Sequence, residues 1–346
     1  MGDVIEGKAE ELDPQHRFPM PLMCASFEPG DLKAAVEGVA DRDRRAIARA
    51  EAFYFTANPD EACRTAEPYL EGPDPALRLS ACFICAYANL SLNRAVLTKK
   101  CLDNLALLRE DSQIGADAAL YASYVLFATA SSVLLHMPAP FDEREQFETA
   151  HVLPEGLRLF SSYVSAHRAY LRGEYGRCVG VVENAMAMKQ GSYPASELFL
   201  CMVAAMGWMS LKDAACAEKW FMHGWRIARP DGLIEEVGEH HGLLQGVLET
   251  RLKDACPEDF ARIIKVTYRF SYGWRRVHNP ETGDDVADDL TTTEFAMAML
   301  ACRGWSNDQI AEHMGVSRGT VKNHLSSVYV KLGIQGRSEL ARFMLR

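Results

Sequence analysis

Residues 290–346 read LTTTEFAMAMLACRGWSNDQIAEHMGVSRGTVKNHLSSVYVKLGIQGRSELARFMLR, and this stretch predicts a run of short, capped helices. Thr291 followed by Glu294 has the spacing of a capping box, in which each side chain accepts a backbone N–H of the other residue. Ser306 with Gln309 repeats the pattern at the start of a second helix. Glycines follow the apolar residues of these helices, where a permissive backbone ends a helix. The sequence therefore predicts helices separated by tight turns.

A third helix is expected to begin after Ser317, a favourable N-cap residue. Its apolar residues recur with helical spacing and form one buried stripe: Val321, Leu325, Val328 and Leu332. The opposite stripe carries hydrogen-bond donors and acceptors: Arg318, Lys322, Asn323, Ser326 and Tyr329. Such side chains suit phosphates and base edges in a DNA major groove. With a fourth helix at residues 337–345, the pattern predicts a helix-turn-helix domain.

This stretch resembles the LuxR-type helix-turn-helix domain, whose pattern is LT..E, G.SN..IA, S..TVK.HL, KLG and R.E. The matching residues are Leu290, Thr291, Glu294, Gly304, Ser306, Asn307, Ile310, Ala311, Ser317, Thr320, Val321, Lys322, His324, Leu325, Lys331, Leu332, Gly333, Arg337 and Glu339. Thr293 and Ala296 depart from the pattern, which has an arginine and a second glutamate there. The resemblance implies a transcription regulator that binds double-stranded DNA as a homodimer. Helix four is the dimer surface that the resemblance implies.

The same resemblance assigns DNA contacts to individual residues. The expected base-facing residues are Lys322, Asn323, Ser326 and Arg318. The expected phosphate-facing residues are Ser306, Asn307, Ser317, Thr320, His324 and Lys331. The chemistry agrees for two of them, because the Lys322 ammonium suits guanine acceptors or phosphate and the Asn323 amide can pair with adenine through two hydrogen bonds.

The charge of the chain is unevenly distributed. The 346 residues carry a formal charge of −10, yet from Asp289 onward seven Lys and Arg stand against five Asp and Glu. Only the C-terminal domain is therefore suited to phosphates, and the acidic remainder should be repelled by DNA. The small positive excess also leaves open an alternative, a helical interaction scaffold whose helix-turn-helix no longer binds DNA.

Residues 31–277 predict an all-α body of helical hairpins. Segment 54–70 resembles segment 88–102, and segment 170–186 resembles segment 208–224; each joins an aromatic-ended helix to one that opens with a small residue. This spacing is typical of a tetratricopeptide-like array, although its full signature is incomplete and an irregular helical bundle remains an alternative. The preceding residues 1–30 are expected to form a loose arm.

Residues 278–289 are acidic, contain turn signals and are expected to form a linker. The aromatic and basic residues 265–280 just before it suggest a segment that packs against the DNA-binding domain and restrains it.

An effector site in the body is suggested by a cluster of tryptophans, Trp208, Trp220 and Trp225, with methionines nearby. The alternative is an ordinary core. The effector itself, a small molecule, peptide or protein, is not specified. His240 and His241 are adjacent, which argues against a shared metal site and suggests an exposed helix face.

Other functions lack their motifs. The chain has no phosphate loop, no metal quartet and no nucleophile elbow, so neither an enzyme nor a cofactor is expected. The Cys82-x-x-Cys85 pair lies in an apolar helical run and predicts packing rather than redox or metal chemistry. Residues 118–141 lack Asp, Glu, Lys and Arg, but their Ser and Thr content and acidic flanks favour a buried helix over a membrane span. A reducing cytoplasm is the expected compartment.

Overall fold

The computed structural model describes residues 17–135, 137, 140–278 and 290–341, and within these it contains helices and no strand. The helices of the body are α1 (Pro21–Cys24), α2 (Leu32–Gly38), α3 (Arg42–Phe55), α4 (Pro59–Ala66), η2 (Glu67–Tyr69), α5 (Pro75–Ser91), α6 (Ala95–Leu107), η3 (Leu108–Glu110), α7 (Ser112–Ala116), α8 (Ala118–Leu134), α9 (Glu143–Ala150), α10 (Glu155–Leu171), α11 (Tyr175–Met188), α12 (Pro194–Ser210), α13 (Ala214–Ala228), η4 (Arg229–Asp231), α14 (Glu235–His240), η5 (His241–Leu243), α15 (Val247–Leu252) and α16 (Pro257–His278). The C-terminal domain contains α17 (Thr292–Cys302), α18 (Asn307–Met314), α19 (Arg318–Lys331) and η7 (Arg337–Glu339). The expected all-α fold is confirmed.

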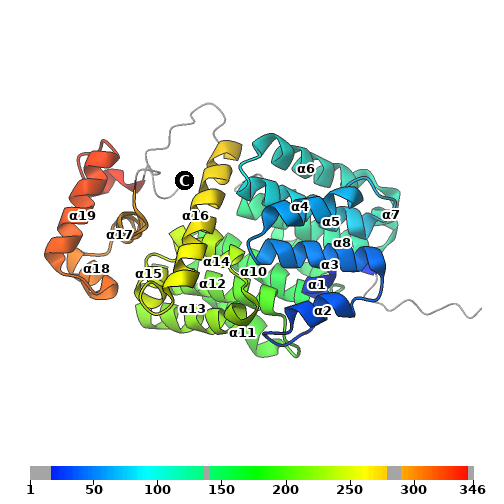
Figure 1. Ribbon diagram of the computed structural model, residues 1–346, viewed down its shortest axis with the longest axis horizontal. Coiled ribbons are helices and arrows are strands. Elements are labelled where there is room, and N and C mark those ends of the chain that lie inside the picture. Colours follow the sequence, from blue (N-terminus) through cyan, green and yellow to red (C-terminus); the bar gives the residue numbers. More distant parts are fainter. Residues whose placement is uncertain (1–16, 136, 138–139, 279–289, 342–346) are drawn as a thin grey trace, which may run out of the picture.

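The body is built from helical hairpins, as the sequence predicted: α3–α4, α5–α6, α10–α11 and α12–α13 each pack side by side (Figure 1). All four turn in the same way. One residue in each turn has a positive φ: Ala57, Asn93, Gly173 or Lys212. The next amide donates to the carbonyl five residues earlier, as in Asn58 to Phe53 at 2.8 Å. This repeated helix stop gives the array its regularity.

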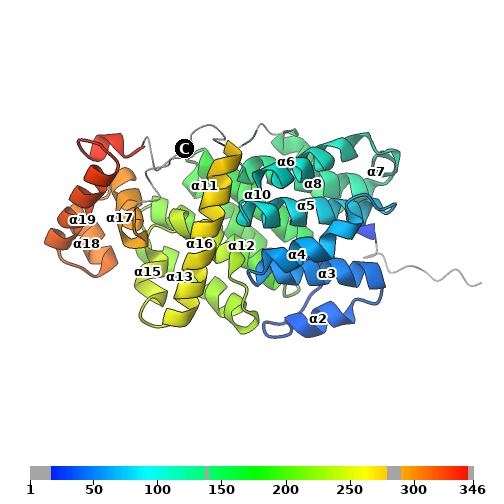
Figure 2. The same cartoon turned by 45° about the horizontal axis from the view of Figure 1, so that its top comes forward.

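The array curves until its ends meet. Helices α14 and α16 pack back against the N-terminal helices α3 and α5, so the later hairpins and the first hairpins enclose a common core (Figures 1 and 2). Gly273 allows the close crossing of α16 over α5, because a Cβ there would lie 1.7 Å from the Leu90 carbonyl oxygen. Among the described residues, no helix is both long and apolar enough to span a bilayer. The uncharged helix α8 is a core helix instead.

The N-terminal segment differs from the expectation. Residues 1–16 lie outside the described part of the chain, but from Phe18 to Cys24 the chain is buried, and it packs between α3 and α10. The amides of Leu22 and Met23 each donate to the Glu51 carboxylate at 3.0 Å. A loose arm over residues 1–30 is therefore wrong for this segment, because a distant carboxylate supplies the acceptors that its own sequence lacks.

The boundary before the C-terminal domain also differs. Helix α16 continues to His278, the first residue of the expected linker, and residues 279–289 lie outside the described part of the chain. Where the sequence predicts a fourth helix at residues 337–345, the described part of the chain has the 3₁₀-helix η7, and residues 342–346 lie outside that part.

Candidate nucleic-acid interface

Three N-terminal caps fix the helices of the C-terminal domain. The Thr291–Glu294 and Ser306–Gln309 capping boxes predicted from the sequence are both complete. The Ser317 hydroxyl accepts the Thr320 amide at 3.0 Å and starts α19. Between α18 and α19, Gly315 has a φ of 66°, which a glycine adopts at little cost. Each helix direction is thus set by local hydrogen bonds.

The inner face of α19 forms the core of the domain. Val321, Leu325 and Val328 are buried against the other helices of the domain, including Ile310 of α18 and Leu300 of α17. This is the apolar stripe that the sequence predicted. Because it is fixed inward, the polar stripe of the same helix faces out.

The outer face of α19 is free. Lys322, Asn323 and Ser326 are exposed, and within the described residues none of them makes a hydrogen bond or ion pair. Arg318 is exposed at the start of the helix, with Nε 3.5 Å from Asp308 Oδ1. In both views α19 lies at the edge of the molecule away from the body (Figures 1 and 2). We call these four residues the α19 face. Lys322, Asn323 and Ser326 can meet another molecule without breaking a contact among the described residues, whereas Arg318 would have to leave Asp308.

The six expected phosphate contacts lie in different surroundings. Three of them, Ser306, Ser317 and Thr320, form the caps of α18 and α19. Asn307 Oδ1 accepts a hydrogen bond from Arg337 Nη2 at 2.8 Å. His324 is half-buried.

Lys331 differs most from the expected phosphate contact, because its Nζ lies 2.7 Å from Glu294 Oε2 and its charge is already compensated. Glu294 also accepts hydrogen bonds from the Thr291 amide at 2.8 Å and the Ser327 hydroxyl at 2.7 Å. Burial raises the pKa of Glu294, but the hydrogen bonds from Lys331, Thr291 and Ser327 outweigh it and lower the pKa to about 2. The sequence identified Glu294 only as a helix cap, whereas it also ties α17 to α19.

The C-terminal domain is docked on the body. The sequence predicted such a contact from residues 265–280, but the docking contacts among the described residues come from other parts of the body. Arg303 lies over the rings of Tyr170 and Tyr175, at 5.3 and 5.6 Å from their centres, and donates hydrogen bonds to both hydroxyls. Lys212 Nζ donates to the Gly304 carbonyl at 3.2 Å. These body residues lie at the tips of the α10–α11 and α12–α13 hairpins.

A second set of docking contacts comes from the chain around η5. Phe295 packs directly on Gly242, where a Cβ would lie 2.8 Å from the ring. Gly246, with a φ of 90°, likewise contacts Met314, and His313 Nε2 lies 3.2 Å from the Gln245 carbonyl oxygen. These docking contacts differ from the restraint expected from residues 265–280. Helix α16 packs chiefly on α14 and α5, and residues 279–280 lie outside the described part of the chain.

The three tryptophans of the expected effector site lie on α12 and α13. Trp225 is buried in the core, whereas Trp208 and Trp220 are half-buried. The Trp208 Nε1 is buried without a hydrogen-bond partner among the described residues. An effector site here remains a prediction. His240 and His241, which were expected on an exposed face, are buried and hydrogen bonded to Tyr163 and Glu249, so that expectation is wrong.

Comparison with known proteins identifies the family that this domain matches. Residues 288–344 match the family described as bacterial regulatory proteins, luxR family. The probable transcriptional regulatory protein SgaR of Hyphomicrobium methylovorum is 43% identical over 54 residues, which are 16% of this chain and 26% of SgaR. The transcriptional regulatory protein DesR of Bacillus subtilis is 31% identical over 97 residues, 27% of this chain and 47% of DesR. The HTH-type transcriptional regulator MalT of Vibrio campbellii is 30% identical over 112 residues, 31% of this chain and 12% of MalT.

The chain thus spans less than half the length of each of these relatives. No solved structure matches the chain. The C-terminal residues form a LuxR-type helix-turn-helix domain, as the sequence predicted, joined to an all-α body.

Proposed function

We propose that the protein is a sequence-specific, DNA-binding transcription regulator. The observation that carries this proposal is the α19 face, where Lys322, Asn323 and Ser326 present donors and acceptors that have no partner among the described residues. The helix that carries them is fixed by packing against α17 and α18. A helix of this kind enters a major groove, where the Asn323 amide pairs with adenine and the Lys322 ammonium with guanine or phosphate. The relatives named above are transcription regulators, in agreement with this role.

On DNA the protein acts as a homodimer on a two-fold site. This part of the proposal rests on the LuxR resemblance, because a two-fold pair of such domains reads half-sites spaced by about one helical turn. The ten cysteines are free thiols, which supports action in a reducing cytoplasm.

The body regulates the DNA-binding domain in response to a ligand or partner. Support comes from the docking contacts, since Arg303, Phe295 and Met314 hold the domain against the body while leaving the α19 face exposed. The body therefore controls the orientation of the domain rather than covering its DNA-binding surface. Two domains held in fixed orientations bind one two-fold site only if those orientations fit the spacing of its half-sites.

The test is recovery of fragments from sheared genomic DNA by the purified full-length protein at several salt concentrations. The wild type should enrich a short two-fold motif, and the double variant Lys322→Ala/Asn323→Ala should not. The salt series separates a DNA-binding regulator from an interaction scaffold. Binding through phosphate contacts weakens as the salt concentration rises, because such contacts release counterions. Equal recovery by both proteins, or no recovery by either, would reject the proposal in favour of the interaction scaffold.

A further inference from the structure

Three cysteines from successive helices meet in the first half of the body. Cys63 lies on α4, Cys85 on α5 and Cys101 on α6, and these helices pack side by side (Figure 1). All three residues are buried and are free thiols. The Cys85 thiol is hydrogen bonded with the thiols of the other two. We call these three residues the thiol cluster.

The thiol cluster is packed closely around Cys85. Its Sγ lies 3.9 Å from the Cys63 carbonyl oxygen, and the Cys63 Sγ lies 4.0 Å from the Cys85 carbonyl oxygen. The Cys101 thiol meets Cys85 from α6. Two thiols in contact are the arrangement from which a disulfide forms once one of them is oxidised.

A cleft leads from the surface toward this cluster. It lies between α5 and α6, has a volume of about 470 Å³, and is lined by Cys82 of α5 and Asn104 of α6. Cys82 neighbours Cys101, and Asn104 follows Cys101 by about one helical turn. A small polar molecule in the cleft is therefore separated from Cys101 by little more than one side chain.

Hydrogen bonding makes the thiols of α5 and α6 unequal. The hydrogen bond from Cys85 lowers the pKa of Cys101, and the charge of Lys100 assists it while burial opposes it. The same hydrogen bond, with that to Cys63, raises the pKa of Cys85. Burial raises the pKa of Cys82 to about 12. Because the thiolate is the nucleophile, Cys101 is the thiol that reacts first.

The pair Cys82-x-x-Cys85, which stands out in the sequence, is not the pair that meets. Cys82 packs in a small core that α5 shares with α7 and α8, whereas Cys85 and Cys101 belong to the main core. The nearest thiols of Cys85 come from other helices, which spacing along α5 does not indicate.

We propose that Cys101 and Cys85 form a peroxide-reactive site, in which hydrogen peroxide converts the two thiols into a disulfide between α6 and α5. The Cys101 thiolate attacks one peroxide oxygen, so that an S–O bond forms and the O–O bond breaks. The hydroxide that leaves takes up the proton released by the Cys101 thiol and becomes water. Cys101 is then a sulfenic acid.

The Cys85 sulfur completes the reaction by attacking the Cys101 sulfur. The S–S bond forms, the S–O bond breaks, and hydroxide leaves with the Cys85 proton as a second water. The two sulfurs have together given two electrons to the peroxide. A small thiol reverses the reaction by exchange, so the disulfide is a transient state in a reducing compartment.

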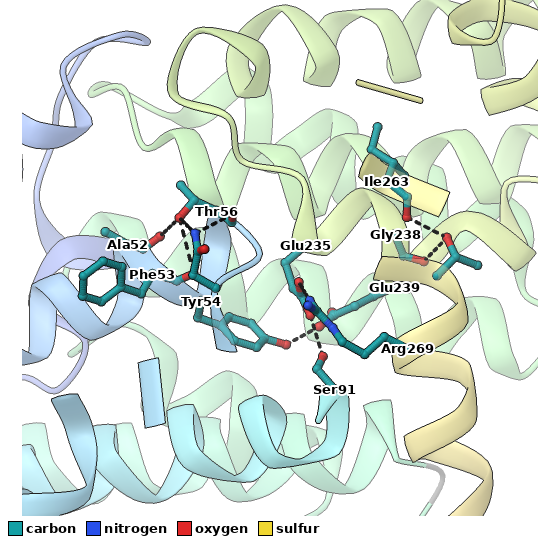
Figure 3. A network of polar contacts seen from close by, with 12 residues as sticks. Ala52, Phe53, Tyr54, Thr56, Ser91, Glu235, Gly238, Glu239, Ile263 and Arg269 are labelled. Carbon is teal, nitrogen blue, oxygen red and sulfur yellow. Dashed lines mark hydrogen bonds and ion pairs between the residues drawn. The ribbon is translucent and has the colours of Figure 1, made fainter. Parts of the chain in front are cut away.

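Helix α5 connects this site to the place where the array closes. Figure 3 shows that Ser91, at the end of α5, donates to Glu235 of α14 at 2.5 Å, and that Arg269 of α16 donates to the same carboxylate at 2.6 Å. Helix α14 continues into η5, where Phe295 of the DNA-binding domain packs on Gly242. A shift of α5 on oxidation is thus passed to the docking contact. As an input to DNA binding, the site rests on the proposed function.

The test treats the reduced full-length protein with hydrogen peroxide and maps the products by mass spectrometry of tryptic peptides. Peptide 79–94 should become linked to peptide 101–109, with fragmentation placing the bond at Cys85 rather than Cys82, and dithiothreitol should reverse the link. The Cys101 thiol should be lost at least about tenfold faster than the buried Cys201 thiol, because one pKa unit changes the thiolate fraction about tenfold.

Variants separate the roles of the thiols. In Cys85→Ala the Cys101 sulfenic acid should persist and be trapped by dimedone, whereas the wild type should lose it to the disulfide. Cys101→Ala should give neither the adduct nor the link. Cys63→Ala is the matched control, because it removes the thiol on the other side of Cys85, and it should form the same link as the wild type. Alanine keeps these buried positions apolar, and circular dichroism checks that each variant folds.

A link from Cys85 to Cys63 instead of Cys101, equal rates of loss for the Cys101 and Cys201 thiols, or equal dimedone adducts in the wild type and Cys85→Ala would each overturn the site. DNA recovery is compared before and after peroxide treatment and should change in the wild type but not in Cys101→Ala. Unchanged recovery rejects the site as an input to DNA binding. No recovery by the reduced protein rejects the proposed function and leaves the thiol chemistry standing.

Discussion

Arg303 donates a hydrogen bond from Nη2 to the Tyr170 hydroxyl at 2.8 Å, and this contact joins the DNA-binding domain to the body. The two residues are 133 positions apart in the chain. The guanidinium also lies over the Tyr170 ring, so one arginine combines a hydrogen bond with a cation–π interaction. The contact uses the end of α17 and leaves the α19 face exposed.

Replacing Arg303 with Met should loosen the docking while retaining most of the side-chain volume. The loss of both interactions should speed amide hydrogen exchange in α17 and α18 by about tenfold. Mass spectrometry of exchanged peptides measures this. Arg318→Met, at an exposed arginine on the opposite side of the domain, is the control and should leave exchange unchanged. Identical exchange in both variants would mean that Arg303 does not hold the domains together.

Gly242→Ala tests the second docking contact independently. The added Cβ would lie 2.8 Å from the Phe295 ring, so the ring must leave its place on η5 and its docking contact is weakened. Exchange in α17 should rise as in Arg303→Met, and DNA affinity should change in the same direction in both variants. Gly180→Ala on α11 is the control, because a Cβ there meets nothing within 4 Å. Opposite changes in DNA affinity would contradict a common docked state.

Asn323→Ala and Lys322→Ala should have different effects on DNA binding. Loss of the Asn323 amide should cost about 1–3 kcal/mol on the preferred site and relax the choice of base at one position. Loss of Lys322, if it meets phosphate, should reduce the slope of affinity against salt by about one. Fluorescence anisotropy titrations distinguish these outcomes. Lys219→Ala on the exposed face of α13 is the control and should change neither the affinity nor its salt dependence. An equally large change in this variant would mean that the loss of any positive charge weakens DNA binding.

Glu294→Gln should destabilise the DNA-binding domain in a pH-dependent way. The pKa of Glu294 is lowered from 4.5 to about 2 in the folded protein, so its charge stabilises the fold above about pH 4.5. This contribution is lost as the pH falls through the folded pKa. Urea unfolding at neutral pH should show a loss of about 2 kcal/mol, and the difference from wild type should shrink toward pH 2. A difference that is constant with pH would exclude the ion pair with Lys331 as its cause.

Glu51→Gln should flatten the pH dependence of stability. Burial raises the pKa of Glu51 from 4.5 to about 8, with the amides of Leu22 and Met23 and the charge of Arg44 opposing the rise. The folded protein therefore keeps a proton that the unfolded chain releases between these values, and the free energy of unfolding falls as the pH rises through this window. Urea unfolding at several pH values should show this fall in the wild type and a weaker one in the variant. Parallel curves would show that Glu51 does not cause it.

The sequence by itself determined the DNA-binding domain. Its caps join residues three apart, such as Thr291 with Glu294 and Ser306 with Gln309, and both formed as predicted. The apolar stripe of α19 and the hairpins of the body follow equally from spacing along the chain. Interactions this close in sequence depend little on the rest of the fold, so a local pattern is enough to predict them.

Only the tertiary structure decided how these parts are joined and what they enclose. Arg303 has the sequence context of a surface arginine, and its tyrosine partners come from a distant hairpin. The segment from Phe18 to Cys24 has the composition of a loose arm, yet Glu51 fixes it in the core. Tyr54 donates a hydrogen bond to Glu239, 185 positions away in the chain, because the array closes on itself. Such contacts depend on which distant helices meet, and that is set by the burial of the whole apolar surface rather than by any local pattern.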